Sequence, residues 1–172
     1  MSNNTLEKII DNRIKEIEYK KRGIPIEQLE EYIIEFEHMY NKKFYDFKKK
    51  IENNIKSNKI SIIAEIKKAS PSAGIIMEDY DPVKIANIYK DNNATCLSVL
   101  TEEKFFLGDM FDISLIKGDK KLNLPILCKD FFVDIYQLYW ARSNGADAIL
   151  IILAGVSDEL AIELYEKALK LN

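Results

Sequence analysis

Glu65 and Lys67 place two opposite charges at the end of an apolar run, residues 62–67, that has the composition of a buried strand. In an extended segment, residues two apart lie on the same face, so these two side chains point the same way. Burying charges is costly unless they are paired. The spacing therefore indicates an ion pair that can serve acid-base chemistry at a strand's carboxyl end. A purely structural ion pair is the alternative.

Lys129 closes a later apolar run, residues 125–129, and is followed by Asp130 and Phe131. A lysine at the end of a strand, partly enclosed by an aromatic ring, can act as a general acid. The alternative is a charge that ends the strand where the chain meets solvent. The spacing alone does not separate these two interpretations.

Further candidates follow the first two apolar runs. Ser70 and Ser72 flank a proline, and serines in that setting commonly form turns. Phe105 and Phe106 suit either the core or the wall of an apolar pocket. His38, the only histidine, lies in a charged helical region and is predicted to be a surface residue. It cannot form the centre of a catalytic triad or a metal cluster.

The elements that must position these residues begin near residue 59, where the pattern starts to alternate between strands and helices. Strands are predicted over residues 60–66, 95–100, 125–128 and 148–153, and helices from near 82 and over 111–117, 135–143 and 158–171. Apolar strands joined by helical crossovers predict an α/β fold with a parallel sheet. Four such units fit either a doubly wound sheet or part of a (β/α)8 barrel. The barrel is favoured because no glycine-rich phosphate loop follows a strand, and polar residues lie at several strand ends.

The amino-terminal part of the chain has a different pattern. Residues 5–57 show apolar positions at three- and four-residue steps, which predicts two or three amphipathic helices with charged outer faces. We therefore expect a helical extension at residues 1–58 and the α/β region at residues 59–172. Basic residues cluster near aromatic ones in this extension, but neighbouring acidic residues favour a solvated helix face. These basic residues are Lys42, Lys43, Lys48, Lys49 and Lys50.

Composition excludes several classes of protein. A net charge of -3 over 172 residues argues against nucleic acid as the main partner. The longest apolar stretch, residues 146–156, is far shorter than the about 20 residues that a membrane span needs. The first residues lack the pattern of a secretory signal. Cys96 and Cys128 lie in apolar runs and are predicted to be buried, reduced thiols. We therefore expect a cytoplasmic protein.

Four motifs together resemble the signature of the indole-3-glycerol phosphate synthase family. They are residues 63–72, residues 97–102 with the following pair of phenylalanines, residues 129–131 and residues 145–150. Their order and spacing agree with the family, so the resemblance covers essentially the whole chain. It implies a (β/α)8 TIM barrel, of which only the first four β-α units are present, preceded by an amino-terminal helical extension. It also implies that no metal or organic cofactor takes part.

Members of this family are carboxy-lyases of tryptophan biosynthesis. They close the indole ring of 1-(2-carboxyphenylamino)-1-deoxyribulose 5-phosphate, a small phosphorylated substrate, with loss of carbon dioxide and water. By resemblance, Lys129 is the general acid that protonates the ribulose carbonyl, and Lys67 pairs with the anthranilate carboxylate and assists dehydration. Glu65 orients both lysines and balances their charge. The resemblance further implies that four residues line the substrate pocket: Ser70, Phe106, Phe131 and Leu150.

The sequence ends after its fourth β-α unit, whereas a whole barrel takes about 250 residues. By resemblance, the other half holds a second catalytic glutamate, an asparagine and the phosphate-binding loops. We therefore expect the 172-residue chain alone to be inactive. Open strand edges and an uncovered barrel interior also predict self-association.

The residues leave three interpretations open. In the first, the sequence is the amino-terminal half of an ordinary synthase, and the activity belongs to the parent protein. In the second, it is a real product that works with a complementing carboxyl-terminal half-barrel chain, or that binds without catalysis. In the third, the four units form a flavodoxin-like binding domain, which needs no lysines at its strand ends.

Overall fold

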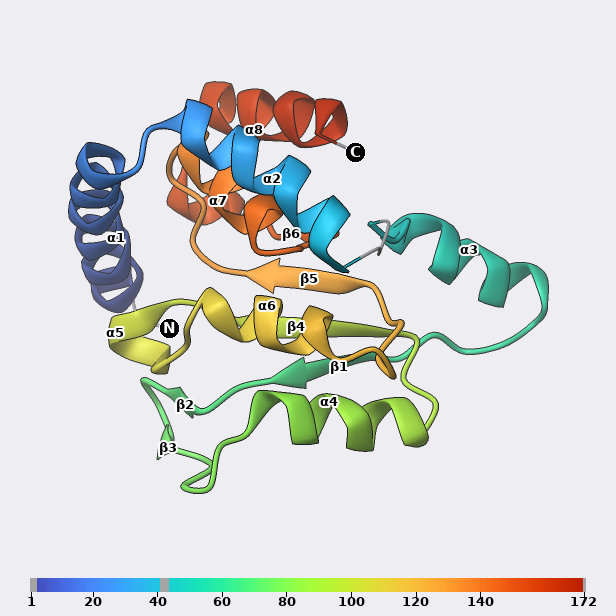
Figure 1. Cartoon of the computed structure of the whole chain (residues 1–172). Helices are drawn as coiled ribbons and strands as arrows, with labels where there is room; N and C mark the ends of the chain where they lie inside the picture. The colour runs from blue at the N-terminus through green and yellow to red at the C-terminus, as the bar shows by residue number, and fades with distance from the viewer. Residues whose placement is uncertain (1–2, 41–43, 172) are drawn as a thin grey trace.

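The computed structural model describes residues 3–40 and 44–171 of the chain (Figure 1). Within these ranges, three helices precede the first strand, and one or more helices follow each strand of the main sheet before the next. The helices before the first strand are α1 (Asn3–Gly23), α2 (Ile26–Tyr40) and α3 (Phe47–Lys56). The elements that follow are β1 (Ile63–Ile66), β2 (Ala69–Ser70), β3 (Gly74–Ile75), α4 (Pro82–Asp91), β4 (Cys96–Leu100), α5 (Glu103–Phe106), α6 (Phe111–Gly118), β5 (Ile126–Lys129), α7 (Tyr136–Ser143), β6 (Ala148–Ile149), the 3-10 turn η1 (Leu153–Gly155) and α8 (Asp158–Lys170).

The main sheet of the described chain is parallel and has four strands in the order β1-β4-β5-β6. This confirms the predicted α/β fold with a parallel sheet. The register places Glu65 of β1 beside Ser98 of β4, and Leu100 of β4 beside Lys129 of β5. Spatial order follows chain order, without the reversal that a doubly wound sheet shows at its switch point. The topology therefore favours a barrel-type arrangement over a flavodoxin-like one.

Two of the predicted strands are too long. The strand predicted over residues 60–66 begins at Ile63, and the strand predicted over residues 148–153 ends at Ile149. β1 and β6 are the outer strands of the sheet, so their ends have a neighbouring strand on one side at most. Two segments for which the sequence predicted neither strand nor helix also have regular structure, namely the hairpin of β2 and β3 and the short helix α5.

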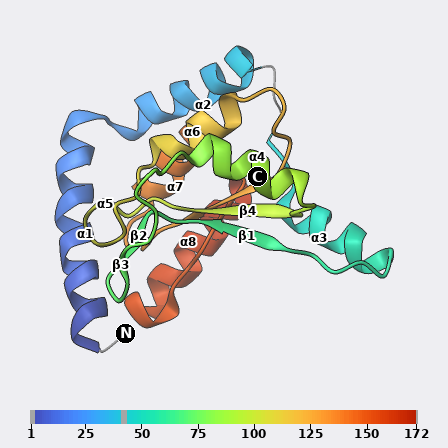
Figure 2. The same cartoon turned by 90° about the horizontal axis from the view of Figure 1, so that it is seen from below.

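Alternation along the strands separates the two faces of the sheet. Ile66, Val99 and Cys128 point to the face that packs on the helices, and all three are fully buried there. Figures 1 and 2 show α4 and α6 on the same side of the sheet. Glu65 and Lys129 belong to the opposite face by the same alternation. One face of the sheet thus forms the main core, and the other carries the charged candidates.

The helices before β1 pack against the later part of the chain. Phe36 of α2 stacks on Phe44, with 6.0 Å between ring centroids, and lies next to Gly145 at the end of α7. Gly145 has a φ of +95°, and a Cβ there would meet the Phe36 ring at 2.6 Å. Glycine is needed at this helix end for both reasons.

Lys117 and Asp147 form a buried ion pair, with 2.6 Å between Nζ and Oδ2. The Asp147 carboxylate also accepts the backbone N–H groups of Ile126 and Tyr45, both at 2.7 Å. Replacing Lys117 with methionine removes the paired cation and leaves the carboxylate buried. We expect a loss of about 3–5 kcal/mol in the free energy of unfolding.

Denaturant unfolding of the Lys117→Met variant measures this loss. Lys48→Met is the matched control, because Lys48 is exposed and its ion pair with Glu52, at 3.7 Å, spans one turn of α3. The control should unfold like the unmodified chain. Equal stability of the two variants would contradict a structural role for the buried pair.

Cys96 and Cys128 are free, buried thiols, as predicted. Burial raises the pKa of both thiols, to about 11 for Cys96, which keeps them protonated and unreactive near neutral pH.

Along the two described ranges, none of the helices has an apolar stretch of the length and purity needed to cross a bilayer.

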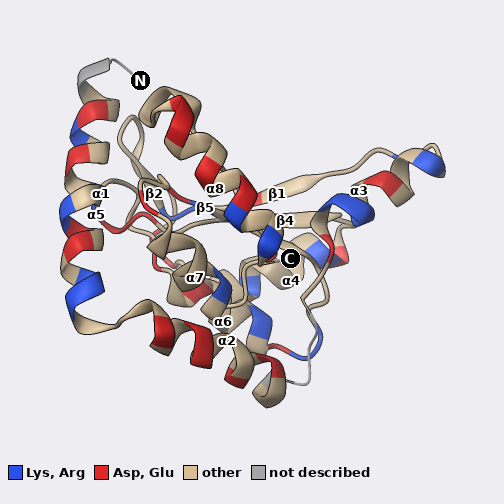
Figure 3. Cartoon of the chain, turned by 90° about the horizontal axis from the view of Figure 1, so that it is seen from above, with Lys and Arg blue, Asp and Glu red and all other residues tan. Residues whose placement is uncertain are grey.

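The lysine-rich segment of the extension is described only in part. Lys42 and Lys43 lie outside the described residues, and Lys48, Lys49 and Lys50 are exposed on α3. Figure 3 shows acidic and basic residues along the same helix. This mixture of signs agrees with the predicted solvated face.

Candidate active site

Glu65, Lys67 and Lys129 form one charged cluster at the carboxyl ends of two strands. The Glu65 Oε1 atom lies 2.7 Å from Lys67 Nζ, and Lys129 Nζ donates a hydrogen bond to Oε2 of the same carboxylate. Each side chain keeps between 29% and 36% of its surface exposed, so the cluster is accessible to a ligand. The predicted Glu65–Lys67 pair is therefore present, and Lys129 completes it.

The parallel register explains how Lys129 reaches Glu65. β4 lies between β1 and β5, so the backbones of β1 and β5 are about 10 Å apart. The register aligns Lys129 with Leu100, two residues beyond the Ser98 that pairs with Glu65. Both charged side chains therefore point to the same face, and the long lysine side chain crosses the intervening strand.

The two lysines determine the ionisation of Glu65. Burial alone raises the pKa of the Glu65 carboxyl, but hydrogen bonds from Lys129 and Lys67, together with their charges, bring the pKa below its ordinary value. A carboxyl whose pKa is lower in the folded than in the unfolded chain stabilises the fold above its ordinary pKa. This contribution is lost as the pH falls through the lowered pKa.

An NMR titration of the Glu65 side-chain carboxyl is expected to give a midpoint below that of an unperturbed glutamate. Glu65→Gln assigns the signal, and Lys67→Met should raise the midpoint, because one of the two stabilising cations is removed. A midpoint at or above the ordinary glutamate value would contradict the paired arrangement.

Phe106 and Phe131 meet near the carboxyl ends of β4 and β5. Their ring centroids are 6.1 Å apart, and both rings are buried in a small apolar group with Leu100 and with Ile9 of α1. This group is separate from the main core on the other face of the sheet. Its place at the carboxyl ends of β4 and β5 agrees with both interpretations that the sequence left open, the core and the wall of an apolar pocket.

Ser70 and Leu150 lie on two other strand ends. The Ser70 hydroxyl accepts the backbone N–H of Ala73 at 3.2 Å and lies 3.4 Å from the Ser72 hydroxyl, in the hairpin of β2 and β3. That is the turn geometry expected from the sequence. Leu150 directly follows β6 and is partly buried. Because β5 and β6 are paired one residue earlier, Leu150 points to the same face as Lys129.

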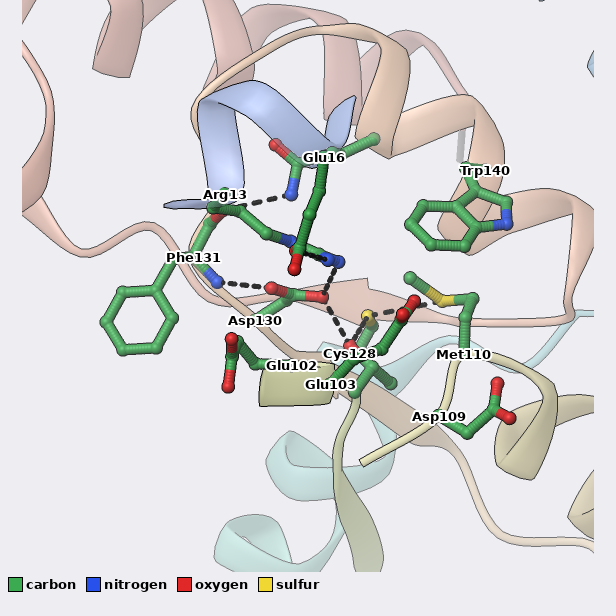
Figure 4. A network of polar contacts seen from close by, with 12 residues as sticks. Arg13, Glu16, Glu102, Glu103, Asp109, Met110, Cys128, Asp130, Phe131 and Trp140 are labelled. Atoms are coloured by element: carbon green, nitrogen blue, oxygen red, sulfur yellow. Dashed lines mark hydrogen bonds and ion pairs between the residues drawn. The ribbon is translucent and has the colours of Figure 1, made fainter. Parts of the chain in front are cut away.

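A buried polar network behind Lys129 escaped sequence reasoning (Figure 4). Arg13 of α1 reaches Asp130 with 2.5 Å between Nη2 and Oδ2, and the Thr101 hydroxyl donates to the same oxygen at 2.6 Å. The other oxygen of Asp130 accepts the backbone N–H of Phe131 at 2.7 Å. These residues surround the segment that carries Lys129.

One sequence signal could have found this network. Ile9, Arg13 and Ile17 follow one another at four-residue steps, so they share one face of α1, and all three are fully buried. A single arginine inside an apolar helix stripe requires a buried acceptor elsewhere in the chain. Asp130 directly follows a buried strand and fits this requirement, but so did other acidic residues of the chain.

A known protein family matches almost the whole chain. A family model described as Indole-3-glycerol phosphate synthase matches residues 6–172. The chain belongs to the indole-3-glycerol phosphate synthase family. The resemblance carried by its four motifs is thereby confirmed.

Several curated relatives bear the same description, and another is described as a tryptophan biosynthesis protein. The chain is 40% identical over 156 residues to an indole-3-glycerol phosphate synthase of Trichodesmium erythraeum, covering 91% of the chain and 50% of the relative. It is 40% identical over 168 residues to an indole-3-glycerol phosphate synthase of Dehalococcoides mccartyi strain ATCC BAA-2266, covering 97% of the chain and 62% of the relative. It is 41% identical over 172 residues to the tryptophan biosynthesis protein TrpCF of Buchnera aphidicola, covering 100% of the chain and 35% of the relative.

This member of the indole-3-glycerol phosphate synthase family matches only part of the length of its relatives. The chain spans about half the length of the curated relatives it matches. The charged cluster and the pair of phenylalanines therefore lie in a chain that matches only this part of those synthases.

Proposed function

We propose that this chain supplies the amino-terminal half of the active site of an indole-3-glycerol phosphate synthase. The observation that supports this proposal most is the cluster of Glu65, Lys67 and Lys129 at neighbouring strand ends in a member of that family. Two ammonium groups on one carboxylate provide acids and an anion site together. Ring closure with loss of carboxylate and water needs both.

In the proposed first step, Lys129 is the general acid. The aromatic carbon that bears the substrate carboxylate attacks the ribulose carbonyl carbon, and a carbon–carbon bond forms. The electron pair of the carbonyl moves to its oxygen, which takes a proton from the Lys129 ammonium. Glu65 holds that ammonium in place through the hydrogen bond to Nζ.

In the later steps, the bond between the ring carbon and the carboxylate breaks and carbon dioxide leaves. The electron pair of that bond stays with the ring and restores its aromaticity. The hydroxyl formed from the carbonyl takes a proton from the Lys67 ammonium and leaves as water. The adjacent carbon of the new ring then gives a proton to the Lys129 amine, which was left neutral by the first step, and the double bond that forms completes the indole. Lys67 first pairs with the substrate carboxylate. The apolar wall of Phe106 and Phe131 favours loss of that charge as carbon dioxide. Ser70 and Leu150 complete the lining of the pocket.

The proposal includes the architecture around the site. Residues 59–172 form the first four units of a (β/α)8 barrel after a helical extension at residues 1–58. Phosphate binding and a second catalytic glutamate then come from the other half-barrel, so the 172-residue chain alone is inactive. The outer strands β1 and β6 and the exposed Ile63 support pairing with that half, with a complementing chain or with a second copy. The reaction takes place in the cytoplasm and uses no cofactor.

Genetic complementation tests this function. The full gene product that carries this sequence should restore growth without tryptophan to a bacterial strain that lacks its own synthase. Residues 1–172 alone should not, whereas co-expression with the carboxyl-terminal half of a curated relative should. Failure of the full gene product, at a level where the protein is folded, would contradict the proposed activity. Growth with residues 1–172 alone would contradict the proposed division of the site.

A further inference from the structure

We propose that Arg13 and Asp130 are positioning residues for Lys129, so that helix α1 is part of the machinery that holds the general acid. This inference rests on the role proposed for Lys129. It assigns to the amino-terminal helix a function in catalysis, through a contact between residues 117 positions apart in the sequence.

Arg13 is the link from the α1 side. Its side chain is fully buried, and its guanidinium binds Glu16 on the same helix at 2.9 Å as well as Asp130. The guanidinium also lies 5.4 Å from the centre of the Trp140 ring on α7. Burial alone would lower the pKa of Arg13, but Asp130 and Glu16 outweigh it and raise the pKa above its ordinary value. The arginine is therefore a fixed cation with a defined orientation.

Asp130 is the link from the β5 side, between Lys129 and Phe131 in the sequence. One carboxylate oxygen binds both Arg13 and the Thr101 hydroxyl, and the other accepts the N–H of Phe131. The side chain has no exposed surface. These contacts fix the backbone on the carboxyl side of Lys129.

Thr101 fixes the backbone of Lys129 itself. Its N–H donates to the Lys129 carbonyl at 3.2 Å, while its hydroxyl binds Asp130. The next residue, Glu102, caps helix α5 by accepting the backbone N–H of Phe106 at 3.0 Å. Both strand ends that carry the acid and the aromatic wall are thus tied to one another and, through Arg13, to α1.

Energetics supports positioning as the purpose of the buried pair. Apolar side chains packed in place of a buried ion pair often give equal or greater stability, because both charges must lose their hydration. Ile9 and Ile17 show that apolar residues fit the same stripe of α1. An arginine between them costs desolvation, and in return it gives a directional contact to the residue next to Lys129.

The test uses the full gene product and compares Arg13→Met, Asp130→Asn and the double variant. We expect kcat to fall by about 10–100-fold in each single variant, because a small misplacement of a catalytic group has effects of this size. KM should change by less than about 3-fold, since the pair does not contact substrate. The double variant should lose no more than the worse single variant, and Arg13→Lys should recover part of kcat.

Lys21→Met is the matched control, because the more exposed Lys21 also ties α1 to the loop after β5 through Asp134. It should keep kcat. Fluorescence of Trp140, the single tryptophan, reports whether α1 remains seated in each variant. Thermal unfolding measures the folded fraction, and kcat is expressed per folded molecule.

Unchanged kcat per folded molecule in Arg13→Met and Asp130→Asn would overturn the inference. If neither variant folds, Thr101→Val decides instead, because it removes the hydroxyl that binds Asp130, and an unchanged kcat in it overturns the inference equally. Absence of turnover in the unmodified protein has a different meaning from unchanged kcat in the variants. It rejects the proposed function itself, whereas a positioning failure leaves the unmodified protein active.

Discussion

Replacing Lys129 with methionine in the full gene product is expected to lower kcat by about 10²–10⁴-fold, the usual contribution of a general acid. Methionine keeps an unbranched apolar stem but cannot donate a proton to the carbonyl oxygen. The free energy of unfolding should change little, because the Lys129 side chain is 36% exposed and its ion pair is partly solvated. Steady-state kinetics and denaturant unfolding on the same preparation measure the two effects.

Lys120→Met is the control for the loss of one positive charge, because Lys120 is an exposed residue away from the strand ends. Its kcat should equal that of the unmodified protein. An unaltered rate in Lys129→Met would remove the acid role from this lysine. A loss of rate matched by unfolding would assign Lys129 a structural role instead.

Replacing Glu65 with glutamine is expected to lower kcat by about 10²-fold, the effect typical of a misplaced catalytic group. Glutamine has nearly the same shape, but it no longer carries the negative charge that binds both Lys67 and Lys129. The two ammonium groups then repel each other and leave the positions in which they meet the substrate. Kinetics at saturating and limiting substrate separates this effect from weaker binding.

A double variant tests whether Glu65 acts through Lys129. Glu65→Gln combined with Lys129→Met should be no slower than Lys129→Met alone, since residues that act as a unit are strongly non-additive. Glu52→Gln, on the exposed face of α3, is the control for a lost carboxylate. Multiplied losses in the double variant would show that Glu65 works independently of the acid.

Local features of the sequence predicted part of this site. The two-residue spacing of Glu65 and Lys67 was sufficient to predict their ion pair, because strand geometry fixes which side chains share a face. The parallel α/β architecture followed from apolar runs that alternate with helical patterns.

Contacts that depend on register could not be predicted in the same way. The approach of Lys129 to Glu65 requires that β4 lie between their strands with a given alignment, and no local pattern specifies that alignment. The contact of Arg13 with Asp130 joins residues far apart in the chain, and many acidic residues were possible partners. The strand ends at Ile149 and Ile63 were misplaced because an apolar composition continues beyond the last paired residue.

The most direct measurement is the conversion of 1-(2-carboxyphenylamino)-1-deoxyribulose 5-phosphate by the purified full gene product, followed by indole absorbance and by release of carbon dioxide. We predict that both appear together and at equal amounts, and that Lys129→Met loses both. Absence of both products from a folded protein, with substrate returned intact, would contradict the assignment of this site to indole ring closure.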